Sequence, residues 1–215
     1  ESFGEDVALL VDGVSKIDQI EFESKEHAEA ENFRKMLLAM AKDIRVILIK
    51  LADRIHNMRT LDSLRSDKRK RIAQQTIDIF APIANRLGMH TWTQELEDLS
   101  FQHLYPKRYS AIHKEISKRR GNRKRVIDRT RLKITEELEE TGINATVVGR
   151  EKNIYSVYRK MHDRRVPMAE MGDIFAIRII VDTVDECYRV LGIIHNLYKP
   201  VPGKFKDYIA ISKIN

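Results

Sequence analysis

The chain contains 215 residues, a length that accommodates one large domain or two modest ones. Hydrophobic residues make up 42% of it, which is typical of a globular protein, and no segment approaches the roughly 18 consecutive apolar residues of a membrane-spanning helix. The net charge of +7 favours an anionic partner but leaves nucleotides, RNA and simple solubility all open.

The start of the chain and its cysteine content predict a cytoplasmic protein. Residues 1–6 carry neither the basic start nor the apolar run of a secretory signal, and the absence of an initial methionine predicts an internal fragment. Cys187 has no partner for an internal disulfide and lies in an amphipathic segment, so we interpret it as a small core residue in a reducing compartment. We expect no association with membranes.

Helical periodicity dominates the first hundred residues. Residues 7–17 form a mixed apolar segment, and a charged connection at 18–25 leads to a helix expected to start near Glu26. From residue 28 to residue 64 the apolar residues recur at intervals of three and four, the spacing of a helix face that packs on a core. A run of this length usually breaks once, and the polar cluster at 41–43 is the expected place.

Proline and glycine mark the ends of the helices that follow. We expect a helix at 68–80 and then a short turn or helix that begins at Pro82 and ends at Gly88. The next helix, which closes the all-helical part of the chain, should be capped by Thr91 or Thr93.

We predict one long helix at residues 106–141, which ends at Gly142. If this helix is interrupted, Gly121 is the expected place. Lysine and arginine crowd the stretch 118–133 within it. A solvated helix face is the ordinary explanation of such a stretch, and attraction to phosphate groups is the alternative.

Strand and helix alternate in the last third of the chain. Segments are expected at 143–148 (strand), 153–164 (helix), 173–181 (strand), 184–197 (helix) and 208–211 (strand). The predicted fold class is therefore α+β, an all-helical portion followed by an α/β portion whose sheet is covered by helices. The boundary should fall between residues 104 and 142, and we place the domains at 1–105 and 106–215.

The first candidate site lies in the segment 50–61. Four polar residues three or four apart share one face of this predicted helix: Asp53, His56, Asn57 and Thr60. The alternative is the polar side of an ordinary amphipathic helix, with Asp53 paired to Lys50 or Arg54. A catalytic cation needs three or more ligands, and the sequence shows no matching cluster of carboxylates and histidines.

The second candidate site runs from Gly149 to Lys160. Gly149 follows a predicted strand and frees a turn, Arg150 and Lys152 come off its end, and the next helix opens with residues that include Ser156. Backbone amides, the positive end of the helix and these cations could all bind one anion. A basic turn between a strand and a helix, without any ligand, is the alternative.

Two further segments carry charge near expected strands. Asp173 opens an apolar segment that we interpret as a buried strand, and a carboxylate in that position can hold a divalent cation or simply cap the loop. Lys204 and Lys206 alternate in the glycine-bearing loop 200–208. This loop could be a cationic lid over phosphates or a basic edge that deters strand pairing.

Taken in order, the candidate segments resemble motifs of the RelA/SpoT homologue family, the enzymes that make and degrade the alarmone (p)ppGpp, and most closely its bifunctional SpoT-like members. Residues 50–61 are similar to the last metal-binding helix of an HD-type hydrolase domain. Residues 149–161, 173–178 and 205–210 are similar to successive motifs of a synthetase domain whose fold is related to nucleotidyltransferases. The similarity extends over essentially all 215 residues.

For the hydrolase, the resemblance implies that Asp53 is one ligand of a Mn²⁺ ion. Asn57, as a catalytic residue, and Thr60 would line the site where the 3′-pyrophosphate is removed from ppGpp. The metal would activate a water molecule for attack on phosphorus.

For the synthetase, the resemblance implies that Asp173 is a catalytic residue and holds the Mg²⁺ ion that bridges the β- and γ-phosphates of ATP. Arg150 would stack on the adenine, and Lys152 and Lys160 would neutralise the phosphates as pyrophosphate passes to the 3′-hydroxyl of GDP or GTP. Further nucleotide contacts are implied for four residues: Ser156, Lys204, Lys206 and Asn215.

Two departures from the family pattern limit these implications. The HD motif with its histidine ligands would precede Glu1, and a stacking tyrosine and a catalytic glutamate would follow Asn215, so we expect the fragment itself to be inactive. In the acceptor-selecting loop 204–207, Lys204 stands where bifunctional members commonly have arginine. The positive charge is kept, but a bidentate contact is lost.

The predicted function is a bifunctional enzyme of the stringent response. It would hydrolyse ppGpp or pppGpp to GDP or GTP with Mn²⁺ and synthesise them from ATP and GDP or GTP with Mg²⁺. A ribosome or a regulatory protein would be a further partner, bound through C-terminal domains outside this chain. Two alternatives stay open: a synthetase with a degenerate hydrolase half, and a noncatalytic module that binds RNA or the ribosome through residues 118–133.

Overall fold

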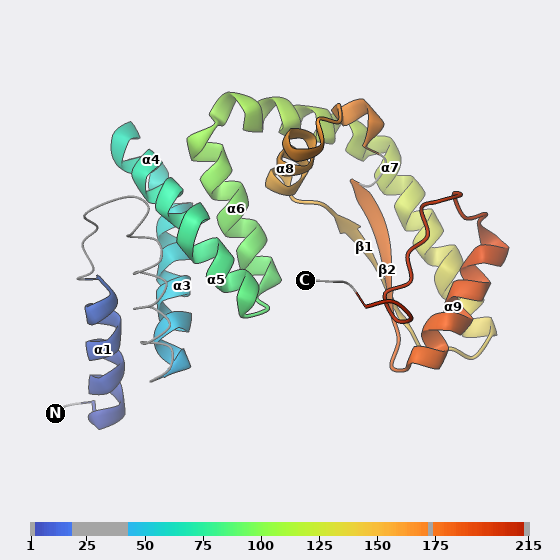
Figure 1. Cartoon of the computed structure of the whole chain (residues 1–215), viewed down its shortest axis with the longest axis horizontal. Helices are drawn as coiled ribbons and strands as arrows, with labels where there is room; N and C mark the ends of the chain where they lie inside the picture. The colour runs from blue at the N-terminus through green and yellow to red at the C-terminus, as the bar shows by residue number, and fades with distance from the viewer. Residues whose placement is uncertain (1–2, 19–42, 172–173, 213–215) are drawn as a thin grey trace. The chain divides into compact units, whose positions relative to one another are not determined.

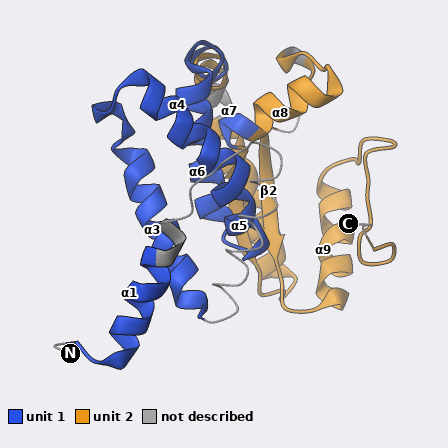
Figure 2. Cartoon of the chain, turned by 60° about the vertical axis from the view of Figure 1, so that its left-hand side comes forward, with its two compact units in different colours: residues 1–112, 153–155 blue, residues 113–152, 156–215 orange. Residues whose placement is uncertain are grey.

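The computed structural model describes residues 3–18, 43–171 and 174–212, and within these ranges the side chains of 119–123 and 169 fall outside the description. The chain divides into two compact units (Figure 2). Unit 1 comprises residues 1–112 with 153–155, and unit 2 comprises residues 113–152 with 156–215. The domain boundary expected at residue 105 stays a prediction.

The described residues of unit 1 before position 113 form helices joined by short turns, and they include no strand. Its elements are α1 (Glu5–Asp18), α3 (Ile44–Arg59), η1 (Leu61–Ser63), α4 (Ser66–Gln75), η2 (Thr76–Phe80), α5 (Ala81–Arg86), α6 (His90–Leu104) and the start of α7 (Pro106–Glu140) (Figure 1). Helices α3, α4, α5 and α6 enclose one hydrophobic core, to which the turns η1 and η2 also contribute. The core therefore holds α3 by its apolar stripe and leaves its polar face outward.

Helix α3 carries the apolar stripe that the periodicity predicted. Four of its buried residues follow the spacing of three and four: Ile47, Leu51, Ile55 and Met58. Asp43 caps the helix, because its Oδ1 accepts a hydrogen bond from the backbone N–H of Arg45 at 2.8 Å. The start of a helix after the polar cluster 41–43 is confirmed, whereas the helix expected near Glu26 lies outside the described residues.

Between α4 and α5 the chain forms a π-helical turn, η2, at Thr76–Phe80. Thr76 is fully buried, and its hydroxyl donates a hydrogen bond to the carbonyl of Ile72 at 2.7 Å. The helix predicted at 68–80 therefore begins earlier, at Ser66, and continues through this wider turn into α5.

The proline and glycine predicted to mark the ends of α5 do so, but the residues predicted to cap α6 do not. Pro82 lies in the first turn of α5, and Gly88 follows its end with φ at +74°. Helix α6 begins at His90, so Thr91 and Thr93 already lie inside its first turn and cannot cap it. The hydroxyl of Thr93 donates instead to a backbone carbonyl four residues earlier, at 3.1 Å.

Unit 2 combines a two-stranded sheet with helices. Its elements are the remainder of α7, β1 (Thr146–Glu151), most of α8 (Ile154–Arg164), η3 (Met168–Glu170), β2 (Phe175–Ile180) and α9 (Val184–Leu197). The strands are antiparallel, with Thr146 opposite Ile180 and Glu151 opposite Phe175. Buried residues of α7, β1, α9 and the loop after α7 form the core: Ile134, Leu138, Ile143, Val147 and Val190. The α+β fold class is confirmed.

The helices of unit 2 follow the predicted boundaries closely. Helix α7 is continuous to Glu140, so Gly121 does not interrupt it, and Gly142 follows with φ at +71°. Helices α8 and α9 begin and end within one residue of the predicted positions. The first strand lies at 146–151 instead of 143–148, because Ile143 is buried in the core after the turn at Gly142.

Two predictions for this unit are wrong. Residues 208–211 form a turn instead of a strand, because Asp207 Oδ1 accepts hydrogen bonds from the backbone N–H groups of Ile209 and Ala210, each at 2.9 Å. Cys187 is exposed and is not a core residue.

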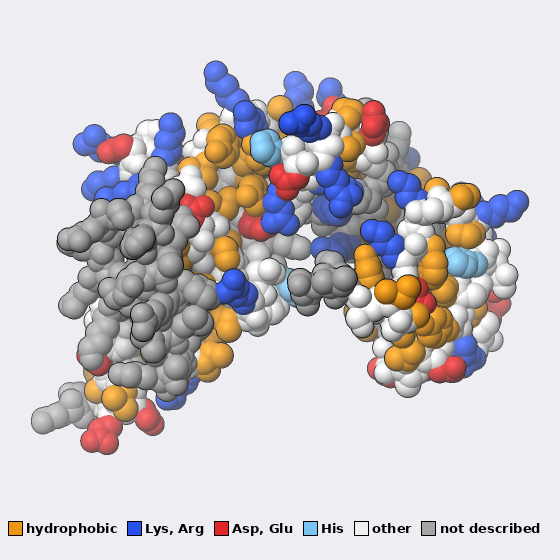
Figure 3. All heavy atoms as spheres, in the orientation of Figure 1, with side chains coloured by type: hydrophobic (Ala, Val, Ile, Leu, Met, Phe, Trp, Pro, Cys, Tyr) orange, Lys and Arg blue, Asp and Glu red, His pale blue; other side chains and the backbone are white. Residues whose placement is uncertain are grey.

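The surface of the C-terminal segment is rich in hydrophobic side chains (Figure 3). The exposed ones are Val201, Phe205, Tyr208, Ile209 and Ile211. In the part of the chain that the structure describes, no helix has both the length and the hydropathy required to cross a membrane.

A capping box sets the start of α9 and gives a stability prediction. The hydroxyl oxygen of Thr183 accepts from the backbone N–H of Glu186 at 3.2 Å, while Glu186 Oε2 accepts from the backbone N–H of Thr183 at 3.1 Å. Thr183→Ala should lower the free energy of unfolding by about 1 kcal/mol, measured by chemical denaturation of this chain. Thr183→Ser keeps the hydroxyl and should retain most of the stability, so an equal loss in both variants would contradict this role of the cap.

Candidate functional site

The polar face of α3 brings two predicted site residues into contact. Asn57 donates a hydrogen bond from Nδ2 to Asp53 Oδ2 across one helical turn, at 3.1 Å. Lys50 Nζ lies 3.8 Å from the same oxygen, and the Lys50 side chain is itself buried. Among the described residues nothing bonds Oδ1 of Asp53, whose side chain is 50% exposed. An amide and a cation therefore position this carboxylate and leave its second oxygen without a hydrogen bond among the described residues.

The other residues of this face do not join the pair. The Thr60 hydroxyl donates to the carbonyl of His56 at 3.2 Å and approaches the carbonyl of Asn57 at 3.4 Å, so it closes the end of its own helix. His56 is exposed. Of the two alternative partners of Asp53, Lys50 is present at the distance given above, and the Arg54 guanidinium lies over the ring of Phe80, 4.0 Å from its centroid.

The described residues fit one metal-ligand position on α3 and no complete metal site. They contain no group of three or more histidine, cysteine, aspartate or glutamate side chains arranged to hold an ion. Asp53 offers a carboxylate oxygen, which suits a hard divalent cation, and Asn57 fixes the orientation of that carboxylate from behind. Further ligands would have to come from outside the described residues.

Helix α6 contributes carboxylates that the sequence interpretation missed. Glu95 accepts from the Arg59 guanidinium at 2.5 Å and 2.9 Å, a bidentate pair that joins α3 to α6 and raises the pKa of Arg59. Asp98 lies one turn further along α6 and accepts three hydrogen bonds from residues 153–155. The spacing of three between the two carboxylates was visible in the sequence, but nothing in it identified their partners.

The second candidate site begins inside a strand. Gly149 pairs with Ile177 and Arg150 with Ala176, so the glycine does not free a turn as predicted. Its small size matters for another reason, because a Cβ atom at Gly149 would lie 3.2 Å from Cγ2 of Ile127 on α7. The Arg150 side chain is exposed at the end of the strand.

Lys152, Ser156 and Lys160 follow this strand. The backbone N–H of Lys152 donates to the carbonyl of Ile174 at 2.9 Å, which prolongs the contact between the strand segments. Ser156 and Lys160 are four residues apart on α8, so they share a helix face, and both are half-buried. The structure thus keeps these three residues and Arg150 in one continuous strand-to-helix element.

The N-terminus of α8 is not available to an anion, which corrects the sequence interpretation. The backbone N–H groups of Ile154 and Tyr155 donate to the Asp98 carboxylate at 3.2 Å and 2.8 Å. Burial raises the pKa of Asp98, and the hydrogen bonds from Tyr155, Ile154 and Asn153 oppose that rise. A carboxylate of the protein therefore occupies the position that a phosphate was expected to take.

Two predicted site residues, Asp173 and Asn215, lie outside the described residues. The strand that Asp173 was expected to open runs from Phe175 to Ile180 and alternates between half-buried and exposed positions. It is not a strand buried on both faces, because β1 is its one neighbour in the described sheet.

The loop that carries Lys204 and Lys206 is fixed to α9. Both lysines are exposed. Asp207 accepts a hydrogen bond from the Tyr188 hydroxyl at 3.1 Å, in addition to its two backbone donors. Backbone donors and Tyr188 hold the pKa of Asp207 below its usual value. The aspartate thus stays ionised at neutral pH and restrains the turn that follows the two lysines.

Two family profiles match separate parts of the chain. The profile described as "HD domain" matches residues 1–90, which contain the polar face of α3. The profile described as "Region found in RelA / SpoT proteins" matches residues 149–215, which contain the element from Arg150 to Lys160.

Curated proteins resemble almost the whole chain. A Vibrio cholerae protein named guanosine-3′,5′-bis(diphosphate) 3′-pyrophosphohydrolase is 55% identical over 213 residues, which cover 99% of this chain and 30% of that protein. The Escherichia coli K12 protein named bifunctional (p)ppGpp synthase/hydrolase SpoT shows the same identity and coverage. A Myxococcus xanthus GTP pyrophosphokinase is 49% identical over 218 residues, covering all of this chain and 29% of that protein. The chain spans about 30% of the length of these relatives.

Proposed function

Because this chain belongs to the RelA/SpoT family, we propose that it forms part of a bifunctional enzyme that hydrolyses (p)ppGpp and also synthesises it from ATP and GDP or GTP. One observation carries this proposal: an HD-domain profile and a RelA/SpoT profile occur in that order on one chain. Relatives that cover 99% of the chain are named for hydrolysis and for both activities.

In the proposed hydrolase half, Asp53 acts as a metal ligand and Asn57 holds it in place. The Asn57 amide occupies Oδ2 of Asp53, so Oδ1 is the oxygen directed to a metal. A divalent cation, proposed to be Mn²⁺, would supply a Lewis acid at the pyrophosphate. Asn57 and Thr60 would contact the substrate beside it, and for Thr60 this requires its hydroxyl to leave the carbonyl of His56.

In the proposed synthetase half, Arg150 stacks on the adenine of ATP, and Lys152 and Lys160 neutralise its phosphates. The exposed position of Arg150 at the end of β1 supports a stacking role, since a guanidinium needs an open face to cover a base. Further proposed nucleotide contacts are Ser156, Lys204, Lys206 and Asn215. Asp173 is proposed to hold Mg²⁺, which would offset charge on the transferring phosphates.

The wider setting is also a proposal. The enzyme would act in the stringent response in the cytoplasm. A ribosome or regulatory protein would bind through domains of the kind that the longer relatives have and this chain does not span. Because the described residues supply a single metal-ligand carboxylate on α3, we expect the 215-residue chain alone to lack hydrolase activity.

The test uses the longer protein that carries this chain. It is incubated with labelled ppGpp and Mn²⁺ in one reaction, and with ATP, GDP and Mg²⁺ in another, and the nucleotides are separated by chromatography. Release of pyrophosphate in the first reaction and formation of ppGpp in the second support the proposal. Synthesis without hydrolysis would indicate a degenerate hydrolase half. Loss of both would favour an RNA-binding module, recognised by an affinity that falls steeply with salt.

A further inference from the structure

Helix α8 is capped by a residue from a distant part of the sequence. Asp98 Oδ2 accepts from the backbone N–H of Ile154 at 3.2 Å, and Asp98 Oδ1 accepts from that of Tyr155 at 2.8 Å. These N–H groups belong to the first turn of α8, which has no helical partners for them. Asp98 precedes them by 56 and 57 residues in the chain. The cap is therefore a tertiary contact.

The residue before α8 strengthens this contact. Asn153 would ordinarily cap the helix with its side-chain oxygen. Its Nδ2 instead donates to Asp98 Oδ1 at 3.1 Å and to Glu97 Oε2 at 3.2 Å. Neighbouring carboxylates of α6 thus hold both the start of the helix and the residue that leads into it.

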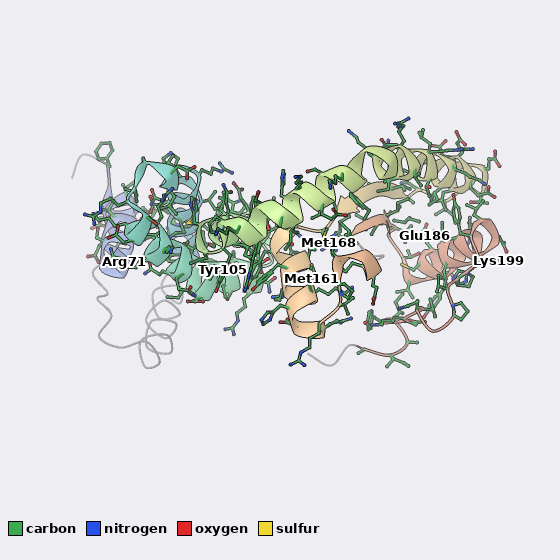
Figure 4. All side chains as sticks on the ribbon, turned by 90° about the horizontal axis from the view of Figure 1, so that it is seen from above. Arg71, Tyr105, Met161, Met168, Glu186 and Lys199 are labelled. Atoms are coloured by element: carbon green, nitrogen blue, oxygen red, sulfur yellow. The ribbon has the colours of Figure 1, made fainter. Side chains whose placement is uncertain are left out.

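An aromatic contact lies beside the polar one. Phe101, one turn after Asp98 on α6, is fully buried, and its ring centroid lies 5.7 Å from that of Tyr155. Phe101 also contacts Tyr109 and Tyr105, and Figure 4 labels Tyr105 at the end of α6. Because of these contacts residues 153–155 belong to the same compact unit as α6.

The capped turn sits in the middle of the proposed ATP-binding segment. Arg150 and Lys152 precede residues 153–155 by at most three positions, and Ser156 and Lys160 follow them by at most five. Any shift or rotation of the first turn of α8 would move side chains on both sides of it. A displacement of about 1 Å in such positioning can cost a large factor in rate.

We propose that Asp98 is a positioning residue for the nucleotide site: its carboxylate fixes the first turn of α8 and thereby the ATP-binding side chains from Arg150 to Lys160. This rests on the synthetase function proposed above. Asp98 does not contact nucleotide in this role, since its oxygens are directed to the protein's own N–H groups. Its negative charge at the helix N-terminus also repels phosphates from that end, so that they would bind Lys152 and Lys160 instead.

The test compares variants in the longer protein with both activities. Asp98→Ala removes both acceptors and should raise KM for ATP in synthesis about tenfold, while ppGpp hydrolysis in the same preparation stays within about twofold and reports an intact fold. Asp98→Asn keeps one acceptor oxygen and should give an intermediate KM. Glu95→Ala is the matched control, because it removes a carboxylate of the same helix that bonds Arg59 and not α8.

Distinct outcomes separate this proposal from the function on which it rests. An unchanged KM for ATP in Asp98→Ala, or an equal rise in Glu95→Ala, overturns the positioning role and leaves the synthetase function standing. Absence of synthesis in the unaltered protein overturns the proposed function and the nucleotide role of Asp98 with it. If Asp98→Ala loses hydrolysis as well, the result for Asp98→Asn decides whether Asp98 is a positioning residue. A raised KM for ATP with normal hydrolysis in Asp98→Asn supports the positioning role. Equal loss of both activities in Asp98→Asn overturns it.

Discussion

Asp53→Asn, made in the longer protein, is expected to reduce ppGpp hydrolysis by roughly 10³-fold or more and to leave synthesis within about twofold. The substitution keeps the shape of the side chain and the acceptor for Asn57, but it removes the negative charge that would bind a cation. Loss of a metal ligand should also raise the Mn²⁺ concentration needed for half-maximal activity. Initial rates of pyrophosphate release, measured across a range of Mn²⁺ concentrations, provide the test.

Two companion variants sharpen this test. Asn57→Ala removes the hydrogen bond that orients Asp53 and should lower the affinity for Mn²⁺ by about 10- to 100-fold. This effect should be smaller than that of losing the ligand itself. Asp67→Asn changes an exposed carboxylate on α4 and should leave both activities as they were. Full hydrolysis by Asp53→Asn would remove Asp53 from the metal site.

Asp173→Asn is expected to have the reverse effect, a loss of synthesis of roughly 10³-fold or more with hydrolysis retained. The expectation rests on the resemblance of the segment 173–178 to a synthetase motif, since Asp173 lies outside the described residues. A carboxylate at this point would hold Mg²⁺ beside the phosphates of ATP, and the neutral amide of asparagine would bind that ion far more weakly. Formation of ppGpp from ATP and GDP is the measurement.

The matched control for Asp173 lies at the far end of the same segment. Asp182 is exposed just after β2, so Asp182→Asn changes an aspartate of the same strand region and should spare synthesis. Equal loss of hydrolysis and synthesis by either Asp53→Asn or Asp173→Asn would contradict the assignment of two separate sites.

Local signals were enough to predict most helices. Helix α9 lies at the predicted positions 184–197, because its apolar period and its capping residues act within four positions of one another. The polar face of α3 was also predictable, and Asp53 and Asn57 do meet there. The role of each residue in metal or nucleotide binding stays a prediction.

Interactions between distant segments could not be predicted in the same way. The cap of α8 joins Asp98 to a helix more than 50 positions later, and periodicity carries no information about that pairing. The prediction of a strand at 208–211 was wrong for a different reason. Its alternating apolar residues favour a strand, but the side chain of Asp207 binds the N–H groups that a neighbouring strand would need.

The π-helical turn η2 makes the length of the segment from Ser66 to Arg86 as important as its composition. A π-turn holds one residue more than the α-helix it interrupts, so it sets the angle at which the apolar side chains of α5 follow those of α4. Deletion of one residue there would remove the wide turn and change the angle at which α5 follows α4, which would disturb the packing of Ile83 and Ala84 in the core. Homologous segments should therefore tolerate substitutions in this region far better than insertions or deletions.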